Sequence, residues 1–289
     1  MRRLKKLLPK KFRSENVEIP VVRLHGAIMS GGNQFSRNLN LASVATLLDK
    51  AFSDKKAPAV AFSINSPGGS PVQSRMIYSR IRQLAEEKDK KVLMFVEDVA
   101  ASGGYMIACA GDEIYVDPSS IVGSIGVISG GFGFPELLKK IGVERRVYTA
   151  GKNKSTLDPF QPEKKADIER LKKLQLEIHD VFIDMVKTSR GDKLVDTVDL
   201  FTGEFWTGIE GKERGLVDDI GDLRSVLKDK FGEKTEMNLI SAKRGIFGGR
   251  PTPGISGLTS MNGEMIAAGL SQGFATTVEE RALWAQYGL

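Results

Sequence analysis

The first hundred residues alternate between apolar runs and turn-forming residues, in the order expected of successive strands and helices. Runs rich in β-branched or other apolar residues predict strands, each ended by Gly, Asn or Pro. Ile77, Ile81 and Leu84 keep the i, i+4, i+7 spacing of a packed helical face. The expected strands cover residues 19–28, 59–64 and 91–96, and the expected helices cover 41–53, 71–87 and a short stretch ending at 110.

The second half of the chain continues this alternation with one long helix. Residues 114–116 and 143–148 read as further strands, and residues 162–190 as a helix that ends at Gly191. The side chains expected to form its packed stripe are Leu171, Leu174, Ile178, Phe182 and Met185. Strands that alternate with helices predict an α/β fold built of βαβ units around a mostly parallel sheet.

The composition changes near residue 240, which divides the chain into three expected parts. Residues 1–17 form a basic arm, residues 18–240 form the folded domain, and residues 241–289 form a Gly/Pro-rich linker with a closing segment of moderate helical character. At 41% hydrophobic and 27% charged residues, the chain resembles soluble globular proteins and is long enough to bury a sizeable core.

The positive charge is concentrated at the N-terminus. The net charge is +6, and the first thirteen residues hold seven Lys or Arg. Leu4, Leu8 and Phe12 interrupt this run at helical spacing, so peripheral contact with an anionic membrane is a possible role, and nucleic-acid binding is not expected. A solvated, frayed terminus is the simpler reading. No apolar stretch is long enough for a membrane span or a secretory signal, so we expect a cytoplasmic protein.

Several residue types that often carry chemistry are scarce. Cys109 is the single cysteine and lies in an apolar stretch, where a buried thiol that only packs is expected. His25 and His179 are far apart in the chain and are expected to lie at the surface or to pack rather than to act. We therefore expect no metal site and no cofactor.

A hydrolase without a histidine base can use lysine, provided that its amine is neutral. Burial in an apolar site lowers the pKa of lysine enough for it to act as a base near neutral pH. Ser102 follows a strand and precedes Gly103-Gly104, where it could be a nucleophile beside helix amides or merely a helix cap. The turn from Asn65 to Gly69 could offer further backbone donors or be an ordinary turn.

Five ordered blocks together resemble signal peptide peptidase A and its relatives. They are spread from about residue 19 to 240, which makes the resemblance specific. The blocks are Ile64-Asn65-Ser66-Pro67-Gly68-Gly69, Ala101-Ser102-Gly103-Gly104-Tyr105, Gly123-Ser124-Ile125-Gly126-Val127, Gly151-Lys152-Asn153-Lys154, and Phe205-Trp206-Thr207-Gly208 through Gly215-Leu216-Val217-Asp218.

The resemblance implies a serine peptidase with a Ser/Lys dyad. Ser102 would be the nucleophile, Lys154 the general base and Ser124 the residue that holds the lysine amine, while the amides of Gly69 and Gly103 would form the oxyanion hole. Lys152 is the rival base, on the same side if the segment is extended. The substrate-binding residues are not indicated.

The resemblance also implies the Clp protease/crotonase superhelix and a homo-oligomer. In short members of the family, the serine and the lysine of one site can come from neighbouring subunits. The substrates would be peptides, such as signal-peptide remnants or membrane-protein segments. From the sequence we do not expect the N-terminal anchor that the resemblance implies for typical bacterial relatives, which leaves that substrate open.

Two other functions are compatible with this fold. A crotonase-like acyl-CoA enzyme would want acidic residues at the oxyanion turn and would give Ser102 and Lys154 no role. A non-catalytic oligomeric scaffold that binds peptides would have no use for both residues. A fluorophosphonate adduct on Ser102 would separate the peptidase from both.

Overall fold

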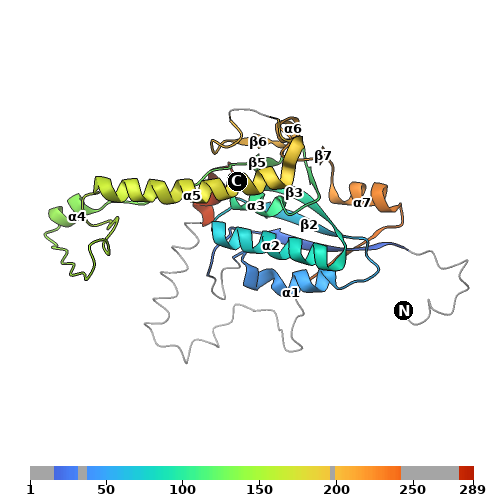
Figure 1. The fold of residues 1–289 in the computed structure, drawn as a ribbon, viewed down its shortest axis with the longest axis horizontal. Coiled ribbons are helices and arrows are strands. Elements are labelled where there is room, and N and C mark those ends of the chain that lie inside the picture. The colour runs from blue at the N-terminus through green and yellow to red at the C-terminus, as the bar shows by residue number, and fades with distance from the viewer. Residues whose placement is uncertain (1–15, 32–37, 196–198, 242–279) are drawn as a thin grey trace, which may run out of the picture.

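A mostly parallel sheet forms the centre of the computed structural model, which describes residues 16–31, 38–195, 199–241 and 280–289 (Figure 1). Its main path runs in the order β6-β5-β3-β2-β1-β8, and β4 pairs with β3 and with β7. Of these pairs only β5 with β6 is antiparallel. The strands are β1 (Glu18–His25), β2 (Ala59–Ser66), β3 (Lys91–Ala101), β4 (Glu113–Val116), β5 (Ile121–Gly123), β6 (Phe205–Thr207), β7 (Asp219–Ile220) and β8 (Glu236–Leu239).

Helices cover both faces of this sheet because alternate strand residues point to opposite sides. On one face, Val22, Phe62 and Met94 belong to the main core with residues of the first three helices and the end of the long helix. On the other face, Val21 and Ala61 pack with Leu227. The helices are α1 (Leu41–Phe52), α2 (Pro71–Lys88), α3 (Gly103–Ala108), α4 (Pro135–Lys140), α5 (Lys165–Arg190), α6 (Gly208–Glu213) and α7 (Leu223–Phe231), with a 3₁₀ turn at Gly191–Lys193.

The ends of the covering helices follow from local sequence. Asn40 accepts from the amide of Ser43, and the Ser43 hydroxyl accepts from the Asn40 amide, which makes a capping box for α1. Ser70 caps α2, with Pro71 in its first turn, and Asp222 caps α7. The Ser70 cap fixes where the chain turns from the carboxyl end of β2 into α2, which is the region of interest below.

The α/β prediction is confirmed, and so are most of its elements. The expected strands at 19–28, 59–64, 91–96 and 114–116 and the expected helices at 41–53, 71–87 and 162–190 all correspond to observed ones within a few residues. The expectations for residues 1–15 and 242–279, which include most of the basic arm and of the Gly/Pro-rich linker, lie outside the described residues.

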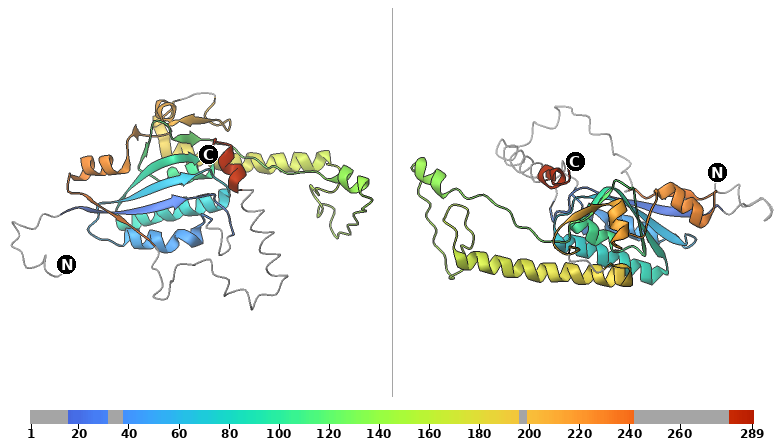
Figure 2. Two further views of the ribbon diagram at one scale, coloured as in Figure 1. Left: turned by 180° about the vertical axis from the view of Figure 1, so that it is seen from behind. Right: turned by 90° about the horizontal axis from the view of Figure 1, so that it is seen from above.

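The expected strand at 143–148 is wrong. This stretch is irregular, and Val143 and Tyr148 are exposed, because it belongs to an arm that leaves the sheet. The arm comprises residues 128–164 and includes α4. In Figures 1 and 2, α4 lies beyond the end of α5 that points away from the sheet. A β-branched run forms a strand only beside a partner strand, and the arm offers none among the described residues.

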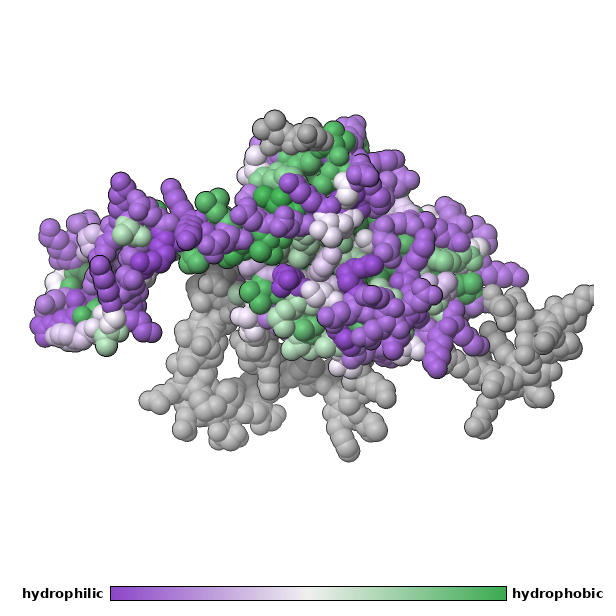
Figure 3. All heavy atoms as spheres, viewed as in Figure 1, coloured by the Kyte–Doolittle hydropathy of each residue, from purple (hydrophilic) through white to green (hydrophobic). Residues whose placement is uncertain are grey.

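The expected packed stripe of α5 is correct only in its second half. Phe182 and Met185 are buried, whereas Leu174 and Ile178 are 51% and 37% exposed. The helix extends past the sheet toward the arm, so its first half has no core to join (Figure 2). Figure 3 shows hydrophobic residues along this stretch of α5, between the arm and the sheet.

Candidate functional site

Three turns meet at the carboxyl edge of the sheet, where β2, β3 and β5 end side by side. Ser66 pairs with Ala100, and Ala101 pairs with Gly123. Ser102 and Ser124 therefore follow a matched pair of residues, and the Ser102 amide donates to the Gly123 carbonyl at 2.8 Å. Crevices at the carboxyl ends of parallel strands are the usual ligand sites of such sheets.

Ser102 has a strained backbone at the step from β3 to α3. Its φ of 49° and ψ of −120° lie in a region that residues with a side chain rarely adopt. Such a conformation costs about 1–3 kcal/mol and is found where a sharp strand-to-helix turn presents a nucleophile. The Ser102 side chain makes no capping hydrogen bond to α3. The reading of Ser102 as a helix cap is therefore not supported, and its hydroxyl is left for another role.

The glycines expected to form an oxyanion hole lie beside each other. A Cβ atom placed on Gly103 would be 3.3 Å from the Gly69 nitrogen, and one placed on Gly68 would be 2.9 Å from the Gly103 nitrogen. Gly69 has a φ of +134°, and a Cβ there would lie 2.1 Å from the Ile28 carbonyl oxygen. Only glycine fits this close backbone approach. The two turns thus bring two backbone amides next to Ser102.

Ser124 is held at the same edge by its own strained turn. Its φ is 51°, and its amide donates to the Glu204 carbonyl at 2.6 Å. The Ser124 side chain faces Tyr287, near the C-terminus of the chain, where burial raises the pKa of the Tyr287 hydroxyl and Ser124 opposes this shift in part. This contact could not be predicted from the sequence, because nothing in the closing segment relates it to residue 124.

Lys154 does not lie at the serine edge in this chain. It lies on the arm, and both it and Lys152 are exposed. The segment forms turns rather than an extended strand, with the Lys154 amide bonded to the Gly151 carbonyl at 3.2 Å. The extended conformation that would put Lys152 and Lys154 on one side of the chain is therefore not present. The lysine is therefore not buried by its own chain.

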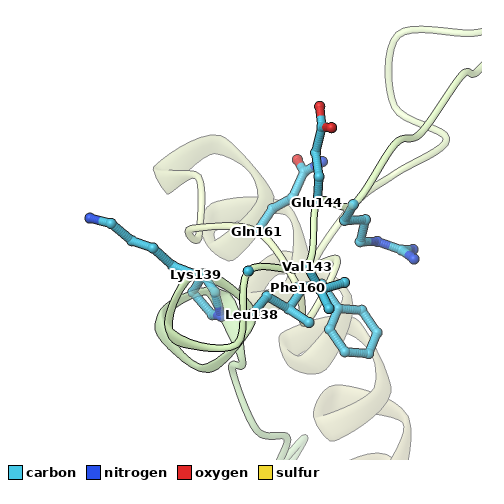
Figure 4. A pocket seen from close by; sticks show the side chains of 9 residues that line it. Leu138, Lys139, Val143, Glu144, Phe160 and Gln161 are labelled. Carbon is cyan, nitrogen blue, oxygen red and sulfur yellow. The ribbon is translucent and has the colours of Figure 1, made fainter.

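The arm is held together by its own contacts, away from the serine edge. The ring of Phe160 packs against Phe134, and the Arg145 guanidinium lies 4.9 Å from the Phe160 centroid while pairing with Asp158 at 2.9 Å. A hollow of about 370 Å³ opens here between α4 and the following loop (Figure 4). It contains none of the candidate catalytic residues, so we do not assign it to the chemistry.

The base of α3 is fixed by buried polar contacts. The Tyr105 hydroxyl donates to the Leu216 carbonyl at 2.6 Å, and Arg190 at the end of α5 pairs with Asp218 at 2.8 Å. Burial raises the pKa of Cys109 to about 12, so its thiol stays protonated and inert, as expected for a packing residue. The first contact ties α3, which follows Ser102, to the stretch at 216–218, and the ion pair ties that stretch to α5.

Each of the two histidines contacts a distant part of the chain. His179 Nε2 lies 3.0 Å from the Ile125 carbonyl oxygen, so α5 is attached to the turn after Ser124. His25 lies against the Trp284 ring. Within the described ranges, no group of three or more His, Cys, Asp or Glu could hold a metal ion. In the same part of the chain, no helix combines the length and the apolar character needed to cross a bilayer.

The comparisons with known proteins point to one family. The profile described as Peptidase family S49 matches residues 85–235. A chloroplastic serine protease, SPPA of Arabidopsis thaliana, is 31% identical over 213 residues, which are 71% of this chain and 31% of that protein.

A second relative is longer and carries a different description. It is described as a Na(+)/H(+) antiporter, NhaA, of Brucella abortus (strain 2308), and is 65% identical over 288 residues. The match covers 99% of this chain and 39% of that protein, so this chain spans about two-fifths of its length.

The fold has a solved counterpart. It is a mutant of the membrane-bound stomatin-specific protease 1510-N, with a TM-score of 0.50 and 16% identity, covering 79% of this chain and 99% of that one. At this identity the likeness shows the fold alone, which agrees with the α/β fold expected from the sequence.

Proposed function

Since this chain belongs to peptidase family S49, we propose that it hydrolyses peptide bonds through an acyl-enzyme on Ser102, with Lys154 as the general base. One observation carries the choice of nucleophile. Ser102 has strained backbone angles at the step from β3 to α3, beside the adjoining amides of Gly69 and Gly103. Strain held next to backbone donors is a feature of acyl-transfer sites rather than of helix caps.

The proposed reaction consists of acylation and deacylation of Ser102, and Lys154 carries the proton in both steps. The Ser102 Oγ attacks the peptide carbonyl while the neutral Lys154 amine takes the hydroxyl proton, and the Gly69 and Gly103 amides bind the oxyanion. The C–N bond then breaks, and the Lys154 ammonium gives its proton to the leaving amine. Water attacks the ester in the same way, releases the acid and restores Ser102. Ser124 would hold the lysine amine through its hydroxyl.

We propose that Lys154 reaches the site from a neighbouring subunit of a homo-oligomer. Two observations support this arrangement. Lys154 is exposed on an arm that extends from the body, and the adjoining half of α5 exposes Leu174, Leu176 and Ile178. A second copy packed against this apolar stretch would bury it and would also shield Lys154 from water.

Peptide hydrolysis, and not ion exchange, is the activity that we propose for this chain. The antiporter description belongs to a protein of which this chain spans 39%, and the shared stretch includes the part that matches the peptidase family. The proposed substrates are peptides such as signal-peptide remnants or membrane-protein segments. The basic residues at the N-terminus support peripheral contact with an anionic membrane on the cytoplasmic side.

The test is labelling with a fluorophosphonate followed by mass spectrometry, with peptide hydrolysis as the second readout. We expect one adduct, on Ser102, and loss of hydrolysis in Ser102→Ala and Lys154→Ala, because neither residue alone generates the alkoxide. Lys152→Ala is the matched control, two positions away on the same arm, and should lose far less. An adduct elsewhere, or an inactive Lys152→Ala beside an active Lys154→Ala, would refute the assignment.

A further inference from the structure

The strand β3 contains a bulge just before Ser102. Ile64 of β2 pairs with Val96, and Ser66 pairs with Ala100, so one residue of β2 faces the three residues 97–99 of β3. A bulge leaves backbone groups of the ladder unpaired and bends the strand that carries it. Bulges are common next to active sites, where they redirect the residues that follow.

The bulge lies where β3 changes its neighbour. Up to Val96 the strand pairs with β4, and from Val99 onward it pairs with β5. The same stretch then places Ala101 beside Gly123 and leads directly into Ser102. The conformation of residues 97–99 therefore sets where the end of β3 lies relative to β2 and β5.

The side chain of Asn65 supplies the partners that the bulge takes from the ladder. Its Oδ1 accepts from the Val99 amide at 3.2 Å, and its Nδ2 donates to the Asp98 carboxylate at 2.5 Å. An N–H group needs an acceptor and a carboxylate needs a donor, which a single amide side chain provides together. Asn65 is 4% exposed, so water does not replace it in these contacts.

The other end of the bulge is held by different groups. The Ser120 hydroxyl donates to the Glu97 carbonyl at 2.6 Å. The Glu97 carboxylate accepts from Arg23 at 2.7 Å and from the Ser63 hydroxyl. Residue 97 thus has its own attachments, and Asn65 is the side chain that bonds to residues 98 and 99.

The register across this bulge decides whether the two proposed oxyanion donors meet. Gly69 and Gly103 follow the paired residues Ser66 and Ala100 by the same number of positions. A Cβ atom placed on Gly103 would be 3.3 Å from the Gly69 nitrogen, so the two amides adjoin. A slip of one residue moves a strand by about 3.3 Å, which would separate them.

We propose that Asn65 is a positioning residue, which holds the bulge of β3 and thereby keeps the Gly69 and Gly103 amides together beside Ser102. The proposal rests on the peptidase function proposed above. Asn65 is buried under the turn and acts through the backbone of β3. Its loss should therefore slow acylation of Ser102, and so lower kcat, while KM changes little.

The test exchanges the two partners in the full-length protein. Asn65→Asp keeps an acceptor for the Val99 amide but sets two carboxylates against each other, which forces the bulge apart. We expect kcat for peptide hydrolysis to fall by about tenfold to a hundredfold, the effect of a small misplacement of catalytic groups. Asp98→Asn alone should lose less, because it leaves an acceptor for the Asn65 amide.

The double variant Asn65→Asp with Asp98→Asn is the decisive one. The amide at position 98 can then donate to the carboxylate at position 65, whose other oxygen still accepts from the Val99 amide. It should recover most of the lost kcat. A residue that only stabilises the fold would not give this recovery in kcat, measured where every variant is folded by circular dichroism.

Asn238→Ala is the matched control. Asn238 also donates to a carboxylate within the sheet, that of Glu18 at 2.6 Å, but it lies on β8 beside the amino end of β1. It should leave kcat and KM unchanged. Hydrogen exchange gives a readout that does not need activity, because the Val99 amide should exchange faster in Asn65→Asp and slow again in the double variant.

An unchanged kcat in Asn65→Asp, or a loss that the double variant does not recover, would overturn the positioning role. If Asn65→Asp does not fold, Asn65→Ser takes its place, with the same loss of kcat expected, because its short hydroxyl cannot serve both Val99 and Asp98. The peptidase proposal fails separately, since it falls if the wild-type protein cleaves no peptide, whatever the exchange of the Val99 amide shows.

Discussion

At the scale of single residues, the serine edge depends on positions where a side chain would not fit. The sequence could predict the two Gly-rich turns and Ser102 from the motif. In the structure Gly103 lies against Ser74, because a Cβ on Gly103 would be 2.4 Å from Ser74 Oγ. The sequence could not predict this contact. Nor could it show that Tyr287 reaches Ser124, because residues 163 positions apart meet only through the fold.

Gly103→Ala, alone and combined with Ser74→Ala, distinguishes an effect on stability from an effect on peptide hydrolysis. The new methyl group would clash with Ser74 Oγ, and overpacking of this kind costs about 1–3 kcal/mol. Adding Ser74→Ala removes the clash and should restore most of the free energy of unfolding, measured in urea. Peptide hydrolysis should stay at least about tenfold down, because the methyl still lies 3.3 Å from the Gly69 nitrogen of the proposed oxyanion hole.

Ser74→Ala alone is the control for this pair. It loses the hydrogen bond from Ser74 Oγ to the Ser70 carbonyl, a net effect of about 0.5–1.5 kcal/mol, and should stay active. Full activity in the double variant would remove Gly69 and Gly103 from the proposed mechanism.

At the scale of elements, the sequence predicts where the helices and the long strands lie along the chain. It does not predict which elements they pack against. The spacing in α5 predicts a helix correctly but cannot tell that Leu174 and Ile178 lie beyond the sheet. The run at 143–148 has a composition typical of a strand, but no strand lies beside it among the described residues. The strands β5 and β6 have three residues each, too short for a periodic signal, yet β5 is the strand that positions Ser124.

A buried ion pair joins the end of α5 to the strand region behind α3. Arg190 is almost fully buried, and Asp218 also accepts from Lys193 at 2.5 Å. Burial by itself would raise the pKa of Asp218, but the bonds from Arg190 and Lys193 outweigh it and hold this pKa below its ordinary value. The carboxylate thus stabilises the fold above the unfolded-state pKa of about 3.9, and this stabilisation is lost as the pH falls through the lower, folded-state pKa.

Asp218→Asn should therefore destabilise the protein most at neutral pH. Leaving the Arg190 guanidinium buried without its partner costs about 3–5 kcal/mol, and the difference from the wild type should shrink as the pH falls below about 4. Urea unfolding at pH 7 and between pH 5 and 3 measures both. Asp219→Asn, which breaks the half-exposed pair with Lys212, should change the stability far less. A pH-independent difference between Asp218→Asn and the wild type would contradict this account.

At the scale of the whole molecule, the arm and the C-terminal segment differ in where they lie relative to Ser102. The arm carries Lys154 away from the serine edge, and the C-terminal segment packs against that edge. The family resemblance implies that serine and lysine can come from different subunits, and the single chain leaves Lys154 exposed on the arm. The tail, by contrast, contacts the serine edge of its own subunit. In our proposal, Lys154 is buried by the surface of a second copy. The sequence pattern around Lys154 carries no information about that surface.

Mixed oligomers test whether one site takes residues from two subunits. Ser102→Ala subunits keep Lys154, Lys154→Ala subunits keep Ser102, and each should be inactive alone. If each site takes its serine from one subunit and its lysine from the next, random co-assembly at equal amounts should restore about a quarter of the sites. Co-expression with two different affinity tags, tandem purification and a peptide hydrolysis assay give this fraction. Mixed oligomers without activity would show that serine and lysine act within one subunit, and that the arm must fold back onto its own Ser102.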